Sequence, residues 1–123
     1  MSKFLKKLRS LAMSNKRPYH VAAILRRRGV PIKIGANSSK THPFCRRDYD
    51  DGSVAYEMHA ETNVLRFALP GDELEVIRFT KTGVSMAKPC IHCQKKIREM
   101  KIKRCRYTDH NGEWQELNLK EEK

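Results

Sequence analysis

The sequence predicts one mixed α/β sandwich built around a single sheet. Its 123 residues are enough for one domain with its own core, since domains commonly hold about 100 to 150 residues. Helical and extended apolar patterns follow one another in the order α-β-β-α-β-α-β-β, which is typical of helices packed on a mixed sheet. We therefore expect residues 1–123 to form a single domain, with an amphipathic basic helix in 1–17 and the core in 18–119.

Apolar residues near the N-terminus recur at helical spacing, with basic residues mostly on the other side: Phe4, Leu5, Leu8, Leu11 and Ala12. This pattern predicts an amphipathic helix. Ser2 can cap its start, and Ser14, Asn15 and Pro18 can end it.

Residues 19–36 predict a hairpin of two strands. Two extended apolar runs flank Arg28-Gly29, where a tight turn can form. The polar stretch 37–58, which includes the segment 38–58, predicts a long loop. A loop of this length in a compact domain is usually functional or disordered.

The second half of the chain predicts a helix, a strand and a second helix. The first helix is expected from His59 to Leu69, ended by Pro70-Gly71. The strand is expected within 74–80, and the second helix, opened by Pro89, within 91–100.

Two further strands are expected around Cys105 to Thr108 and from Trp114 to Leu119. Only Asp109 to Glu113 separate them, which is too short for a parallel crossover of about a dozen residues or more. The last two strands should therefore be antiparallel, and the sheet should hold five strands of mixed direction.

The charge is large and one-sided. Lys and Arg number 26 against 14 Asp and Glu, for a net charge of +12, and no acid lies in residues 1–47. Such a basic half favours partners that carry phosphate, nucleic acid among them. No apolar run approaches the roughly 18 residues of a membrane span, so we expect no membrane partner.

The four cysteines predict thiols in a reducing compartment. The N-terminal segment carries charges where a signal peptide needs an apolar run, so we expect a cytoplasmic protein. A basic, acid-free N-terminus is also compatible with a mitochondrial presequence, although the same segment can serve as a docking helix.

Two short motifs carry the chemistry: His59-Ala60-Glu61 and Pro89-Cys90-Ile91-His92-Cys93. Cys-x-x-Cys at the start of a helix directs two sulfurs to one point, and His59 can supply a third ligand. Three protein ligands leave one position of a tetrahedral zinc open for water, as in catalytic sites. Glu61, two residues after His59, can move protons at that water without ligating the metal.

The chain resembles the zinc-dependent cytidine and deoxycytidylate deaminase superfamily on these two motifs, over about residues 18–119. Gly35-Ala36-Asn37-Ser38 and Lys40-Thr41-His42-Pro43 also resemble the small stand-alone members of phages and large DNA viruses. The resemblance implies a three-layer sandwich, a hydrolytic reaction that converts cytosine to uracil with release of ammonia, and a homo-oligomer.

The resemblance also implies a role for each matching residue. His59, Cys90 and Cys93 would bind Zn²⁺. Glu61 would protonate N3 of the base, activate water for attack at C4 and pass a proton to ammonia. The backbone N–H of Ala60 would hold the base carbonyl, and Asn37 would contact a sugar hydroxyl.

The substrate stays open at this point. An antiparallel final pair of strands resembles the free-nucleoside branch of the superfamily, whereas a charge of +12 is unusual for an enzyme that meets a neutral nucleoside. Cytidine, deoxycytidine and dCMP are the candidates, and a modified or purine base remains an alternative. A deaminase of single-stranded DNA or RNA, held by the basic N-terminal half, is a second interpretation.

Two non-catalytic interpretations remain beside these. A non-enzymatic zinc or nucleic-acid binding module could use the same scaffold. A Cys-x-x-Cys can also form half of a structural zinc site, with a fourth ligand from His92, Cys45 or Cys105. The His-x-Glu upstream favours the catalytic interpretation.

Overall fold

The computed structural model describes residues 2–120, so Met1 and residues 121–123 of the expected domain lie outside it. The described chain holds three α-helices, a short 3-10 helix and eight strands. In chain order these are α1 (Lys3–Met13), β1 (His20–Arg27), β2 (Val30–Ala36), the 3-10 helix (Pro43–Cys45), β3 (Arg47–Asp48), β4 (Val54–Ala55), α2 (Ala60–Leu65), β5 (Glu73–Phe79), β6 (Val84–Ser85), α3 (Ile91–Glu99), β7 (Arg104–Thr108) and β8 (Trp114–Glu116).

The main sheet has the strand order β2-β1-β5-β7-β8, with the short strand β6 paired to the end of β5. Strands β5 and β7 run parallel, and the other pairs are antiparallel. The last two strands form the expected antiparallel hairpin, in which Thr108 lies opposite Trp114. The predicted mixed sheet of five strands is confirmed, and β6 is an addition that the sequence did not predict.

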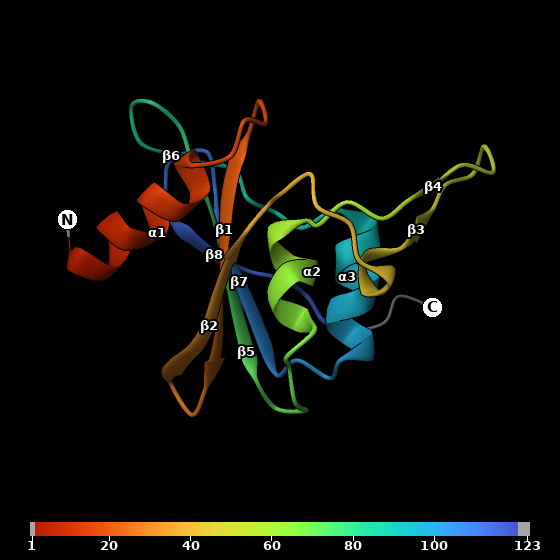
Figure 1. The fold of residues 1–123 in the computed structure, drawn as a ribbon. Helices are drawn as coiled ribbons and strands as arrows, with labels where there is room; N and C mark the ends of the chain where they lie inside the picture. The colour runs from red at the N-terminus through yellow and green to blue at the C-terminus, as the bar shows by residue number, and fades with distance from the viewer. Residues whose placement is uncertain (1, 121–123) are drawn as a thin grey trace.

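The helices cover the two faces of the sheet and make three layers, as Figure 1 shows. Helix α1 packs on one face, where Leu8 and Ala12 meet apolar residues of β1 and β5. Helices α2 and α3 pack on the other face, around a core that contains Val64, Leu65 and Ile97. Strand β5 contributes side chains to both cores, one from each face, because side chains alternate along a strand.

Helix α1 begins and ends where its sequence predicts. The side chain of Ser2 accepts a hydrogen bond from the backbone N–H of Leu5 at 3.1 Å, which satisfies a donor of the first turn. Ser14 follows as the C-terminal cap. Leu8, 1% exposed, anchors the apolar face of the helix to the sheet.

The hairpin of β1 and β2 turns at Arg28 and Gly29, with φ angles of 53° and 78°. Two successive positive φ angles are typical of the type I′ turn, whose twist matches that of the flanking strands. The tight turn expected at this dipeptide is therefore confirmed.

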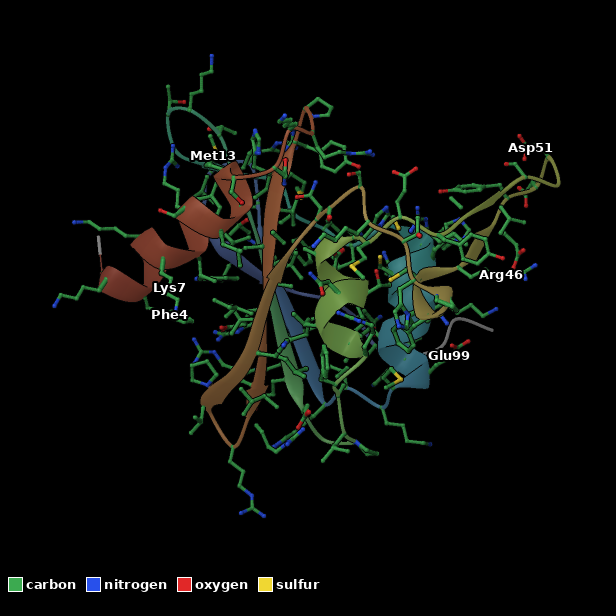
Figure 2. All side chains as sticks on the ribbon, in the orientation of Figure 1. Phe4, Lys7, Met13, Arg46, Asp51 and Glu99 are labelled. Carbon is green, nitrogen blue, oxygen red and sulfur yellow. The ribbon has the colours of Figure 1, made fainter. Side chains whose placement is uncertain are left out.

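The prediction of a plain loop over residues 37–58 is wrong, because the segment contains the 3-10 helix and the two-stranded sheet of β3 and β4. Arg47 is buried and donates hydrogen bonds to the carbonyl oxygens of Cys45 and Glu57, at 3.3 and 2.7 Å. These bonds order the base of the β3–β4 hairpin. The hairpin extends away from the body of the protein, with Asp51 near its tip in Figure 2. Gly52 turns the chain there with a φ of 86°.

Helix α2 is shorter than expected. It ends at Leu65, and residues up to 68 continue as hydrogen-bonded turns in which Phe67 and Ala68 donate to Val64 and Leu65. In residues 2–120, no helix is long and apolar enough to cross a membrane.

Candidate metal centre

His59, Cys90 and Cys93 meet at the N-terminal ends of helices α2 and α3. His59 caps α2 and Cys90 caps α3, while Cys93 lies in the first turn of α3. The Nδ1 atom of His59 lies 3.2 Å from Sγ of Cys93 and 3.6 Å from Sγ of Cys90. The three ligand atoms all lie within 4.8 Å of one another. The fold thus brings together the three residues that the sequence singled out as ligands.

This spacing fits a zinc ion. Zn–N bonds of about 2.0–2.1 Å and Zn–S bonds of about 2.3 Å place tetrahedral ligand atoms about 3.5–3.8 Å apart. The two N···S distances lie close to that range, and imidazole with two thiolates is a donor set that zinc prefers. Within residues 2–120 no other His, Cys, Asp or Glu joins the group. Three ligands leave a fourth position for water or substrate.

A hydrogen bond joins the side chains of Cys90 and Cys93. A hydrogen bond from the Cys93 thiol, together with the His59 imidazole, lowers the pKa of Cys90 to about 3. The same hydrogen bond and burial raise the pKa of Cys93 far above that of an ordinary thiol. Zinc binds the thiolate form of cysteine, so both thiols would release their protons when the metal binds.

Glu61 lies two residues after His59, in the first turn of α2, and is 6% exposed. Burial raises the pKa of its carboxyl group above the usual value. None of the ion pairs in the described part of the chain includes Glu61. A buried carboxyl group without an ion-pair partner holds its proton more readily than an exposed one, which suits it to take up and release a proton.

These residues line one cavity of about 200 Å³. Of the residues expected at the site, Asn37, His59, Ala60, Glu61 and Cys90 line the cavity. Cys93 is fully buried behind them. The cavity also includes Tyr19, Arg78 and Lys88, which sequence analysis did not single out. One signal was available, since Arg78 is a basic residue between the apolar residues Ile77 and Phe79, near the end of β5.

Asn37 follows directly after β2 and is 3% exposed. Its Oδ1 atom accepts hydrogen bonds from the backbone of Val21 at 2.9 Å and from the side chain of Asn15 at 3.0 Å. Its Nδ2 atom donates to the carbonyl oxygen of Tyr19 at 3.1 Å. These bonds fix the amide in place at the cavity and leave one N–H of Nδ2 without a partner among the described residues.

The candidates for a fourth protein ligand lie elsewhere. The His92 ring packs edge-on against Tyr49, with centroids 5.0 Å apart. Cys45 and Cys105 are both buried and belong to no group of potential ligands in residues 2–120. The geometry of the described chain therefore favours a three-ligand site over a closed structural one.

Comparisons with known proteins agree with this geometry. The family model for the cytidine and deoxycytidylate deaminase zinc-binding region matches residues 1–109. No curated protein matches the chain. Two solved structures of a dCMP deaminase from the cyanophage S-TIM5 share its fold.

One of these structures is a complex with dCMP and dUMP, and it is 24% identical with a TM-score of 0.53, over 89% of this chain and 84% of that one. The other is an apo form, 22% identical with a TM-score of 0.55, over 89% of this chain and 86% of that one.

Proposed function

The chain belongs to the cytidine and deoxycytidylate deaminase family, and we propose that it converts a cytosine nucleoside or nucleotide to the uracil form with release of ammonia. The observation that carries this proposal is the placement of Glu61 in the same cavity as His59 and Cys90. A proton carrier beside a three-ligand metal site is the arrangement that hydrolytic deamination needs.

His59, Cys90 and Cys93 would hold the zinc ion. When bound, this ion supplies a Lewis acid that lowers the pKa of water from about 15.7 to about 7. The net reaction consumes one water molecule, forms a carbon–oxygen bond at C4 of the base and breaks the bond from C4 to the amino nitrogen.

Glu61 would carry the protons of this reaction. It takes one from the attacking water, delivers it to N3 of the ring and later passes a proton to the departing ammonia. The raised pKa of the buried carboxyl group supports this role, since a group that both accepts and donates protons works best near the operating pH.

Two further groups would position the substrate. The backbone N–H of Ala60, in the first turn of α2, would donate to the base carbonyl. Asn37 would contact a sugar hydroxyl, and the unpartnered N–H of its Nδ2 atom supports this assignment. The small volume of the cavity favours one base with its sugar.

A deaminase of single-stranded nucleic acid is the second candidate, because residues 1–47 contain many Lys and Arg residues and no Asp or Glu. The basic helix α1, however, packs on the sheet face opposite α2 and α3. A strand held by α1 would have to cross the sheet edge to reach Glu61, so a small substrate is favoured.

We also infer a homo-oligomer, from the resemblance to family members that complete one another's sites. Large apolar side chains are exposed at several places, among them Ile91 at 76% and Leu69 at 54%. Sedimentation velocity of the zinc-loaded protein tests this inference, and a single species with the mass of one chain would contradict it.

The proposed reaction is tested by measuring ammonia release by the zinc-loaded protein. The substrates are cytidine, deoxycytidine, their monophosphates and a short single strand that contains cytosine. Turnover of a small substrate that is lost in Glu61→Ala supports the proposal. Turnover of the strand alone would favour the second candidate. No turnover of any substrate by a zinc-loaded protein would point to another base or to a non-enzymatic binding module.

A further inference from the structure

We propose that Arg78, assisted by Lys88, binds the phosphate group of a mononucleotide substrate. The proposal rests on the deaminase function proposed above, and it assigns the substrate to the nucleoside monophosphates. It starts from the two basic residues that line the cavity beside His59 and Glu61.

Arg78 lies near the end of β5 and faces the side of the sheet that carries the metal centre. Side chains alternate along a strand, so Arg78 shares the face of Leu74 and Val76, which pack in the core with α2 and α3. Its neighbours in the sheet are Val21 of β1 and Ser85 of β6. Val21 also lines the cavity, which confirms that this register directs Arg78 to the site.

The Arg78 guanidinium lacks any partner among residues 2–120. Its Nε atom is buried and forms no hydrogen bond. Two other arginines have a buried Nε without a partner, but each donates through Nη2, Arg98 to the carbonyl oxygen of Asn118 and Arg106 to the carboxylate of Glu75. Arg78 donates no side-chain hydrogen bond to the described chain, and an unmet buried donor is costly. An acceptor from a ligand would satisfy it.

The charges at the cavity favour an anion. Glu61 is the only acidic residue in the lining, whereas Arg78 and Lys88 are both basic. Lys88 is exposed, directly precedes Pro89 and Cys90, and forms no ion pair in the described part of the chain. A guanidinium matches the oxygens of a phosphate with two parallel hydrogen bonds, and a lysine adds a point charge.

A single phosphate group fits this set better than a run of phosphates. Arg17 contacts Tyr19 at the cavity, but its guanidinium is already paired with Glu57 at 2.9 Å. The two basic residues of the lining are Arg78 and Lys88, and neither pairs with a carboxylate within residues 2–120. A neutral nucleoside would leave both of them unused, so the structure favours a monophosphate over a nucleoside despite the antiparallel β7 and β8.

The test compares phosphorylated and unphosphorylated ligands. Calorimetry measures the binding of dUMP and deoxyuridine to the zinc-loaded protein, and ammonia release gives kcat/KM for dCMP and deoxycytidine. In Arg78→Gln, dUMP affinity and kcat/KM for dCMP should each fall about ten- to a hundredfold, while the values for the nucleosides change less than about threefold. Lys88→Gln should show a smaller loss of the same kind. Lys81→Gln, in the exposed turn after β5, is the matched control and should show none.

Arg78→Lys separates recognition from folding, because it keeps the charge and loses the paired donors. The dUMP affinity of Arg78→Lys should lie between those of the wild type and Arg78→Gln, and its melting temperature should equal that of the wild type. Equal binding of dUMP and deoxyuridine by the wild type would overturn the assignment, as would an equal loss of both in the variants. A preference for a short strand over dUMP that disappears in Arg78→Lys would overturn the choice of a mononucleotide. Absence of ammonia release from every substrate counts against the proposed function instead, because dUMP binding is measured independently.

Discussion

The Nδ1 atom of His59 lies 3.2 Å from the Sγ atom of Cys93, although 34 positions separate the two residues in the chain. Helices α2 and α3 make this contact by packing side by side with their N-terminal ends together, as the ribbon in Figure 1 shows. Both helix ends contribute partial positive charge, which stabilises a thiolate there. The pair therefore joins two local sequence motifs through the packing of α2 against α3.

Replacing Glu61 should remove activity and keep the metal. In Glu61→Gln the side chain retains its size but cannot carry a proton, so turnover should fall about a hundred- to ten-thousandfold or more. Ammonia release measures the loss, and elemental analysis should find the zinc content of the wild type. Glu99→Gln, on the exposed side of α3, is the control and should keep full activity. Wild-type turnover in Glu61→Gln would remove the proton carrier from the mechanism.

Replacing a ligand cysteine should remove the metal first. Cys90→Ser should lose zinc during dialysis, because a hydroxyl group is a far weaker zinc ligand than a thiolate. Cys45→Ala should keep it, because Cys45 is buried in another part of the protein and joins no ligand group in the described chain. Equal zinc content in the two variants would contradict the assignment of the ligands.

Gly35 should tolerate no side chain, because strand β2 approaches helix α2 closely at this point. A Cβ atom there would lie 2.8 Å from Nδ2 of Asn63 and 3.0 Å from Cγ1 of Val64. The same Asn63 nitrogen donates to the carbonyl oxygen of Ala36, so it is held in place. Gly35→Ala should lower the free energy of unfolding by about 1–3 kcal/mol in urea titrations.

Gly83→Ala is the matched control for that substitution, since a methyl group added at Gly83 would meet no described residue within 4 Å other than its two chain neighbours. Its free energy of unfolding should stay within about 0.5 kcal/mol of the wild type. If the two alanine variants proved equally stable, the close approach of β2 to α2 would not be as described.

Low pH should lower the folding stability of the protein by protonating Asp72. Its carboxylate accepts hydrogen bonds from Nε and Nη2 of Arg27 at 2.8 and 2.9 Å and from the backbone of Leu69 at 2.9 Å. The Arg27 guanidinium, followed by the Leu69 N–H, holds the pKa of Asp72 below its usual value. A lowered folded-state pKa stabilises the protein above the unfolded value of about 3.9, and this stabilisation is lost as the pH falls toward the folded value.

Asp72→Asn should therefore be about 1.5–3 kcal/mol less stable than the wild type at pH 7, and the difference should shrink at about pH 3. Urea unfolding at the two pH values measures it. Asp48→Asn, whose exposed carboxylate pairs with Arg46, should leave the free energy of unfolding nearly unchanged. If the free energy of unfolding of Asp72→Asn differed from that of the wild type by the same amount at both pH values, the charge of Asp72 would contribute nothing to stability.

Much of the fold and the metal centre could be predicted from the sequence because their signals are local. The Arg28-Gly29 turn fixes the first hairpin, and its positive φ angles follow from the twist of the strands. His59 and Cys90 lie at helix starts, so their motifs place them at the ends of α2 and α3. The short connection from Thr108 to Trp114 permits only an antiparallel pair.

The features that sequence analysis missed depend on long-range contacts. The β3–β4 hairpin depends on hydrogen bonds from Arg47 to carbonyl oxygens on both sides of it, and no local propensity reports them. Arg78 faces the cavity only because of its register against Val21. The strand pattern gives the alternation of faces, but not which face holds the metal centre.

The most direct test of the account follows deamination of dCMP and deoxycytidine in water enriched in heavy oxygen. Zinc-loaded wild type, zinc-free wild type and zinc-loaded Glu61→Ala are compared by mass spectrometry of the product and by ammonia release. Zinc-loaded wild type alone should release ammonia, and its uracil product should carry one heavy oxygen at C4. Equal turnover by the zinc-free protein or by Glu61→Ala, or a product without the heavy oxygen, would contradict hydrolysis at this site.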